Sequence, residues 1–401
     1  MKTVAELDFS DKAYEERWSH VREEFWGELR KETQRGLKRL IETALEVEMQ
    51  DLIGARRDER TTKRGAYRNG YYSRGLLTGM GFISPIMVPR ARGKRLRFKA
   101  FKRYARRSSD VDRALLEIFL AGVSTRRVQE AVAPLLGPSA ASAGAISRLT
   151  KVLDPEVRRF HERALPDTYE YLLLDGVYLK AKSPLQSRRR CILVAYGIKA
   201  NGLKELIDFQ LVAKGESQNA WERFLSQLRY RGLEGRNLKL ITVDGNKGLW
   251  NALDIVWPFV KRQRCWAHKL RNVANYLPKK LQKACMGQAR DIYAAEGRAA
   301  ALRAFRVWAR TWRPICREAV LCLEQDFGDM LAFFDVPKPL WKRVRTTNAI
   351  ERIFREVRRR TRPMSCFQNT DSVQRIIFAI FYRMNSMWKR KPLLMRVTQD
   401  S

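Results

Sequence analysis

Histidine, cysteine and long apolar runs are all scarce in this 401-residue sequence, which has three histidines and six cysteines. The cysteines are scattered with no Cys-x-x-Cys pair, which excludes a disulfide framework and makes a reducing cytoplasm the expected compartment. So few imidazoles exclude a zinc enzyme built on several histidines, so catalysis is expected to rest on carboxylates. No run approaches the roughly 18 apolar residues of a membrane span, and residues 1–16 lack the apolar core of a signal peptide.

Acidic residues are the minority among the charged side chains. The chain has 79 Lys and Arg against 43 Asp and Glu, a net charge of +36. Folding does not require this excess, which repels itself in a compact state. A polyanion is therefore the expected partner, with nucleic acid ahead of a membrane and no small-molecule substrate. The 45% of hydrophobic residues is enough for two or three folded domains, which excludes a mostly disordered chain.

The first 60 residues are predicted to form an N-terminal helical region. Residues 1–50 carry nine basic and twelve acidic side chains, so the positive charge lies further along the chain. From Leu37 the apolar positions follow helical spacing until Gly54. This amphipathic helix either packs against the rest of the protein or forms a dimer contact.

Residues 61–108 are predicted to be a basic, Gly- and Arg-rich segment that binds DNA. Glycines and Asn69 interrupt its first part, and a strand over 83–89 is cut by Pro85. Residues 90–107 then contain ten basic residues, no acid and three interleaved aromatics. This pattern suits contact with phosphates and stacking on bases, although a charge run is also typical of a solvated face. The candidate phosphate contacts are Arg95, Lys99, Arg103 and Arg107.

Residues 109–165 are predicted to form three helices, over 110–120, 124–136 and 142–164. The second and third are joined by a Gly-containing turn, as in a helix-turn-helix that reads the major groove. In that case Arg148 and Lys151 are the candidate DNA contacts. A plain three-helix scaffold is the alternative.

From residue 166 the pattern indicates an α/β core with a mixed sheet. Three antiparallel strands are expected over 171–181, 191–200 and 204–213, followed by a helix, a strand over 238–245 and a helix over 247–256. Residues 166–265 form the first part of this core and residues 266–340 an all-helical insertion. Residues 341–401 return to the core as helices, the first beginning near Asn348.

Three acidic residues of this core are candidates for catalysis. Asp175 lies in an apolar central strand, Asp244 ends the fourth strand, and Glu351 is in the first turn of a helix. Each has a structural alternative: a basic partner for Asp175, turn chemistry for Asp244, and a capping box with Asn348 for Glu351. Together they supply oxygen ligands for Mg²⁺ or Mn²⁺, and two such ions about 4 Å apart promote phosphodiester displacement.

The positive charge is dense around Glu351. The segment Trp341–Pro363 has nine basic and two acidic residues, which indicates phosphates drawn across the site, beyond what a solvated helix face explains. The candidate contacts are Arg345, Arg355, Arg358 and Arg359.

Five segments together resemble the Mutator-type transposases of bacterial insertion sequences: GAYRNGYYSRG, LLLDGVYLK, LITVDGNKGL, QRCWAHKLRNV and RTTNAIERIFREVRRRTRP. The resemblance implies a ribonuclease H-like catalytic domain with a helical insertion, in which Asp175, Asp244 and Glu351 form the acidic triad of a DDE transposase. It also places the family's Cys-x-x-His motif at Cys265 and His268, which cannot complete a tetrahedral zinc site alone. Phe354 departs from the pattern, since many relatives carry Asn there, and a polar contact near the DNA is expected to be missing.

The expected function is therefore transposition of an insertion sequence. The protein would bind the terminal inverted repeats of its element, cleave DNA with metal-activated water and join the 3′-hydroxyl to target DNA, as a homodimer on two element ends. It would act in the bacterial cytoplasm, on the nucleoid. A non-catalytic DNA-binding regulator or transposase relic, and a plain metal-dependent nuclease, are the alternatives.

Overall fold

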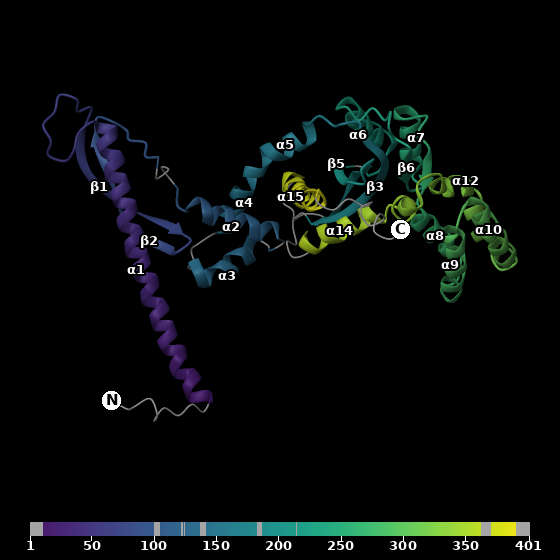
Figure 1. Ribbon diagram of the computed structural model, residues 1–401, viewed down its shortest axis with the longest axis horizontal. Coiled ribbons are helices and arrows are strands. Elements are labelled where there is room, and N and C mark those ends of the chain that lie inside the picture. The colour runs from purple at the N-terminus through teal and green to yellow at the C-terminus, as the bar shows by residue number, and fades with distance from the viewer. Residues whose placement is uncertain are drawn as a thin grey trace. The chain divides into compact units, whose positions relative to one another are not determined.

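The computed structural model describes residues 11–99, 105–121, 123, 125–136, 142–182, 187–213, 215–361 and 370–389. The chain forms two compact units, Met1–Leu149 and Thr150–Ser401 (Figure 1). This division lies earlier than the boundary near residue 165 that the sequence indicates. In the described part of the chain, no helix is both long and apolar enough to cross a membrane.

The first unit is built on one long helix. Helix α1 (Asp11–Ile53) packs its C-terminal half against the hairpin of β1 (Tyr67–Thr78) and β2 (Gly81–Arg92). Leu45 is fully buried against Ile83, Ile86 and other strand residues. The helix ends before Gly54 as predicted, but it begins well before Leu37, at Asp11.

The glycine-rich segment of the first unit is a strand rather than a loop. Strand β1 pairs antiparallel with β2, and the register shifts between Arg68 and Tyr71. Gly70 lies at this shift with φ +67°, a conformation that glycine adopts without strain. The glycines expected to interrupt this segment are therefore accommodated within a strand, Gly70 at a β-bulge.

Four helical segments follow the hairpin: α2 (Ser109–Leu120), α3 (Thr125–Leu136), α4 (Ala143–Thr150) and, after a 3₁₀ turn at Lys151–Leu153, α5 (Asp154–Glu162). The prediction of one continuous helix over 142–164 is therefore wrong. Pro155 lies in the first turn of α5, where the missing N–H costs no hydrogen bond. In the interior of a longer helix the same proline would break the helix, so α4 and α5 are separate. Arg375 binds Asp154 through two guanidinium nitrogens, at 2.5 and 2.9 Å, so α5 packs with the second unit.

The second unit contains the predicted mixed sheet, with strand order β5-β4-β3-β6-β7. The three long strands β3 (Tyr169–Lys182), β4 (Ser187–Lys199) and β5 (Lys204–Val212) are antiparallel, whereas β6 (Leu240–Val243) runs parallel to β3 and β7 (Arg262–Arg264) parallel to β6. The sequence predicts four of these strands. It misses β7, because three residues with two arginines carry no strand pattern.

Helices cover both faces of this sheet. Helices α6 (Gln218–Tyr230) and α7 (Lys247–Val256) bury one face together with Leu172, Leu174 and Leu193. On the opposite face, α15 (Thr370–Trp388) packs Phe381 against Phe209 of β5, and α14 (Asn348–Thr361) contacts β3. Asp175 of β3 pairs with Val194 of β4, which in turn pairs with Phe209 of β5. Residues that pair across a sheet share a face, so Asp175 lies on the face covered by α14 and α15.

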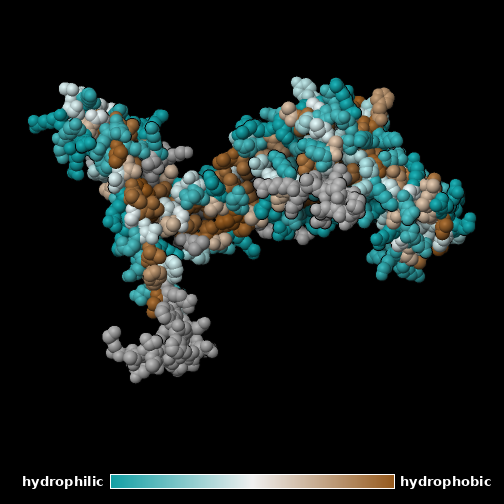
Figure 2. Space-filling view, viewed as in Figure 1, coloured by the Kyte–Doolittle hydropathy of each residue, from teal (hydrophilic) through white to brown (hydrophobic). Residues whose placement is uncertain are grey.

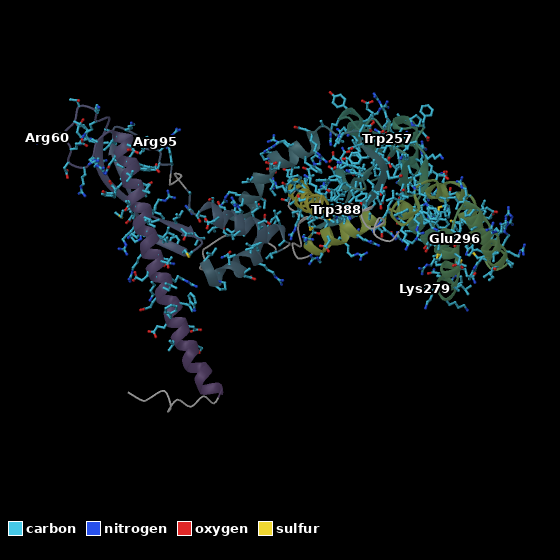
Figure 3. All side chains as sticks on the ribbon, in the orientation of Figure 1. Arg60, Arg95, Trp257, Lys279, Glu296 and Trp388 are labelled. Atoms are coloured by element: carbon cyan, nitrogen blue, oxygen red, sulfur yellow. The ribbon has the colours of Figure 1, made fainter. Side chains whose placement is uncertain are left out.

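Residues 266–340 are helical, as predicted. The segment comprises α8 (Trp266–Asn275), α9 (Lys279–Ala294), α10 (Arg298–Trp312), α11 (Arg317–Glu324) and α12 (Phe327–Met330), followed by 3₁₀ turns, and α13 (Trp341–Val344) leads back to the core. Helices α9 and α10 pack together around the buried Trp308. Figure 3 labels Lys279 at the start of α9 and Glu296 in its turn to α10.

Candidate active site

The register of the sheet places two acidic residues side by side. Leu173 of β3 pairs with Thr242 of the parallel β6, so Asp175 and Asp244, each two residues further on, reach the same level at the carboxyl end of β6. Ligands gather at such strand ends in open α/β sheets. Two aspartates that are far apart in the sequence therefore lie on neighbouring strands of the sheet.

Asp175 is a buried carboxylate, only 4% exposed. Burial raises its pKa to about 7; the charge of His268 opposes this rise, and the nearby Asp244 and Glu216 carboxylates reinforce it. No lysine or arginine of the described segments forms an ion pair with it. The alternative of a basic partner therefore finds no support, and Asp175 lies in a concentration of negative charge.

Asp244 begins the turn between β6 and α7. Its carboxylate accepts a hydrogen bond from the backbone N–H of Asn246 at 3.0 Å, and its carbonyl accepts one from the indole N–H of Trp250 at 2.8 Å. Asn246 caps α7 by accepting from the N–H of Leu249 at 3.1 Å. The turn chemistry expected as the alternative for Asp244 is therefore present through one carboxylate oxygen, whereas the cap of α7 is Asn246.

Glu351 lies in the first turn of α14, on the helix that covers β3. Its carboxylate accepts a hydrogen bond from Arg271 of α8 at 3.1 Å and lies 3.7 Å from Nε2 of His268. The carboxylate thus points toward α8 rather than back to the backbone of Asn348. The capping-box alternative is not what the structure contains, and Glu351 shares His268 as a neighbour with Asp175 and Asp244.

The Cys-x-x-His motif lies beside these acids. Cys265 is fully buried just before α8, and its sulfur accepts a hydrogen bond from the backbone N–H of Thr347 at 3.3 Å. The hydrogen bond with Cys265 raises the pKa of His268 to about 9, and the charges of Cys265, Asp175 and Asp244 add to this against the effect of burial. Burial alone would raise the pKa of the Cys265 thiol, but the hydrogen bond and charge of His268 lower it overall.

A fourth carboxylate, Glu216, belongs to the same cluster and was missed from the sequence. A Cβ at Gly176 would lie 2.2 Å from Cδ of Glu216. The Glu216 carboxyl group therefore occupies the space that a side chain at position 176 would need. Glu216 also accepts a hydrogen bond from the Asn246 amide at 3.2 Å. Burial and the Asp244 carboxylate raise its pKa to about 7. The signal in the sequence was Gly176 itself, because a glycine inside a strand marks a close approach.

The donor set suits a hard divalent cation. Asp175, Asp244, Glu216 and Glu351 offer only oxygen ligands, and burial, reinforced by the neighbouring carboxylates, raises the pKa values of Asp175 and Glu216. Among the described residues, no three acidic, His or Cys side chains already converge as a metal cage. Mg²⁺ does not require one, since it binds through one or two carboxylates, waters and substrate phosphates.

The predicted phosphate contacts of the first unit differ in their surroundings. Arg95 and Lys99 are exposed, and Arg95 lines a groove of about 560 Å³ with Arg74, Arg90, Lys94 and Arg106. Figure 3 shows Arg60 and Arg95 at the same end of this unit, where α1 finishes. Arg107 is 18% exposed and pairs with Asp112 at 2.5 Å, so its charge is largely neutralised within the fold. Arg103 lies outside the described residues.

Arg148 and Lys151 are both exposed but belong to different elements. Arg148 lies on α4 in the first unit, whereas Lys151 lies in the 3₁₀ turn that opens the second. Their contacts with bases stay a prediction, and the break after α4 means that one rigid helix does not present both.

The arginines around Glu351 are of two kinds. Arg355 and Arg358 are exposed, and Arg359 is exposed while paired with Glu356 at 3.0 Å. Arg345 is half-buried, donates to the carbonyl of Tyr293 at 2.7 Å and stacks over its ring, so it joins the insertion to the core. An exposed cation that the sequence did not single out, Arg271, contacts Glu351 directly.

Phe354 belongs to the core. It is fully buried, and its ring lies 6.2 Å from that of Phe381. This position of α14 faces the sheet, and the expectation that a polar contact near the DNA is missing here stays a prediction.

The second unit is a mixed α/β sheet with acidic side chains at neighbouring strand ends and on a later helix. Comparison with known proteins shows which family has this arrangement. A model of the family "Transposase, Mutator family" matches residues 21–391. The transposase for insertion sequence element ISRM5 of Rhizobium meliloti is 33% identical over 357 residues, 88% of each chain. The transposase for IS256 in transposon Tn4001 of Staphylococcus aureus is 32% identical over 347 residues, 86% of this chain and 87% of that relative. The chain belongs to the Mutator family of transposases, as the resemblance indicated.

Among solved structures, the Drosophila P element transposase strand transfer complex is similar at 12% identity. The match covers 74% of this chain and 81% of that chain, with a TM-score of 0.30.

Proposed function

We propose that this transposase cleaves DNA at the ends of its insertion sequence and joins them to target DNA, using Asp175, Asp244 and Glu351 as a DDE triad. The observation that carries the proposal is that acids from β3, the end of β6 and α14 share His268 as a neighbour, while no lysine or arginine of the described segments is paired to Asp175. Four motifs spread over 172–363 supply these residues. A relic under no catalytic demand has no need of a buried carboxylate with acidic neighbours.

The chain's own residues have separate tasks in this reaction. Asp175, Asp244 and Glu351 would hold the Mg²⁺ or Mn²⁺ ions through their carboxylate oxygens, and Glu351 would exchange its contact with Arg271 for this role. The ions, when bound, supply activation of the attacking oxygen and stabilisation of the leaving one. Exposed Arg355 and Arg358 on α14 hold the phosphate backbone beside the carboxylates, which would otherwise repel it.

The topology supports a ribonuclease H-like core. Three antiparallel strands are followed by two short parallel ones, and the chain leaves for a helical insertion after β7 and returns with the helix that carries Glu351. This is the arrangement that the family resemblance implies. The insertion lies between Asp244 and Glu351 and begins after β7, the last strand of this sheet, so it does not interrupt the sheet.

DNA recognition is assigned to the first unit. Its groove of about 560 Å³ is lined by arginines and a lysine, which suits phosphates, and exposed Arg148 on α4 is the candidate for base contacts in the terminal repeats. Phosphate contacts supply affinity but carry no base identity.

A homodimer that holds two element ends is the proposed working form. Val21, Phe25, Trp26 and Leu29 of α1 are 44 to 59% exposed and lie within three turns of the helix. Figure 2 shows apolar residues along this part of α1. A helix that exposes several large apolar side chains in one region is typical of a protein interface.

Incubation of the full-length protein with Mg²⁺, labelled DNA from the ends that flank its gene, and a plasmid tests the proposal. Cleavage followed by joined product is the expected result. Cleavage without joining would indicate a plain nuclease, and binding without cleavage would indicate a regulator or relic. A scrambled end sequence is the matched control for terminal-repeat recognition.

A further inference from the structure

The backbone that leads into α14 is attached to the sheet at several points. The Thr242 hydroxyl donates to the carbonyl of Val344, and the N–H of Trp266 donates to the carbonyl of Arg345 at 3.1 Å. The N–H of Thr347 donates to the Cys265 sulfur at 3.3 Å. Thr347 is fully buried, so without that sulfur its N–H would be an unsatisfied donor at the start of a helix. Cys265 therefore fixes the point at which α14 begins.

His268 connects the same point to the acidic side chain. Cys265 and His268 are three residues apart across the start of α8, which places them on one face. Nδ1 of His268 lies 3.4 Å from the Thr347 hydroxyl, and Nε2 lies 3.7 Å from the Glu351 carboxylate. One side of the ring thus faces the backbone start of α14, and the other faces the carboxylate one turn further on.

We propose that Cys265 and His268 are positioning residues that set where Glu351 stands relative to Asp175 and Asp244, Cys265 through the Thr347 backbone and His268 through the Glu351 side chain. The inference rests on the proposed role of Glu351. Such a clamp is needed because Glu351 comes from a helix that follows a long insertion, whereas both aspartates belong to adjacent strands. The Cys265 sulfur is already engaged by the N–H and hydroxyl of Thr347, which argues against a role as a zinc ligand.

Conservative substitutions separate the two contacts. In H268Q the amide reaches the position of Nε2 and faces Glu351, whereas in H268N it reaches only the position of Nδ1 and faces Thr347. C265S keeps an acceptor for the Thr347 N–H, whereas C265A removes it. C285A, which changes a buried cysteine of α9, is the matched control.

The test measures single-turnover cleavage of terminal-repeat DNA by the full-length variants across Mg²⁺ concentrations, together with Mn²⁺ binding by electron paramagnetic resonance without DNA. We expect C265A and H268N to lose about 100-fold in rate, as for a catalytic group displaced by about 1 Å, and to need more Mg²⁺ for half-maximal rate. C265S and H268Q should recover most of the rate. DNA affinity and C285A should match the wild type.

Equal rates for C265S and C265A, or for H268Q and H268N, would overturn the inference, as would a loss of rate at an unchanged Mg²⁺ requirement. If C265A fails to fold, the H268Q and H268N pair decides. Wild-type protein that neither binds Mn²⁺ nor cleaves DNA would refute the proposed function itself, and the inference with it.

Discussion

Replacing Asp175 with Asn should make the metal-free protein more stable while it abolishes the reaction. The buried carboxylate has a pKa of about 7 in the fold against an ordinary value of 3.8. At about 1.4 kcal/mol per pKa unit, this difference corresponds to about 4 kcal/mol of destabilisation when the group is ionised. The Asp175 carboxylate forms a hydrogen bond with the Thr347 side chain. Asn has nearly the same shape and can keep this bond, but it carries no charge to desolvate.

The sign of the pH dependence follows from the direction of this pKa. The native state holds the Asp175 proton more tightly than the unfolded state does, so the wild type gains stability as the pH falls from about 7 to about 4. The stability gain of D175N should therefore be greatest at pH 8 and vanish near pH 4. Bound Mg²⁺ should stabilise the wild type and have little effect on the variant.

Urea denaturation followed by tryptophan fluorescence, in EDTA and at several pH values, measures the effect. D291N, which neutralises an exposed aspartate of α9 in the same unit, is the control and should change the free energy of unfolding little. A D175N protein no more stable than the wild type at pH 8, or a gain that does not depend on pH, would refute the assignment of Asp175 as an ionised carboxylate awaiting a cation.

Two further predictions concern the fourth carboxylate and the DNA path. E216Q should retain DNA binding but weaken Mn²⁺ binding, as measured by electron paramagnetic resonance. G176A should weaken Mn²⁺ binding too, because its methyl group displaces the Glu216 side chain. Normal Mn²⁺ binding by both variants would show that Glu216 is not part of the site. Joint replacement of Arg95 and Lys99 with Ala should reduce the slope of log affinity against log salt by about 2, read from filter-binding titrations. R107A should leave that slope unchanged and lower the melting temperature, because Arg107 pairs with Asp112. A reduced slope at an unchanged melting temperature would instead show that Arg107 contacts a phosphate.

Sequence reasoning succeeds where local pattern and tertiary role coincide. The apolar runs around Asp175 and before Asp244 predict buried strands, and helix α7 begins at the predicted Lys247 because Asn246 is a good N-cap. Asp175 is found because an ionisable group is out of place in such a strand.

It fails where the fold itself creates the feature. Glu216 has no motif of its own, and only the close approach to Gly176 shows that it joins the cluster. Strand β7 exists because β6 offers it a parallel edge, although its own residues favour solvent. The start of α14 depends on a sulfur more than 80 residues earlier in the chain, a contact that no periodicity encodes.

The central claim is that Asp175, Asp244 and Glu351 act together as ligands for the ions that drive strand transfer. The most direct measurement is the yield of joined product from D175N, D244N and E351Q with terminal-repeat DNA and plasmid, beside DNA affinity for each. The account predicts a loss of about 4 kcal/mol of transition-state stabilisation, roughly 10³-fold, in every variant at unchanged affinity. Near wild-type joining by any one of the three would contradict it.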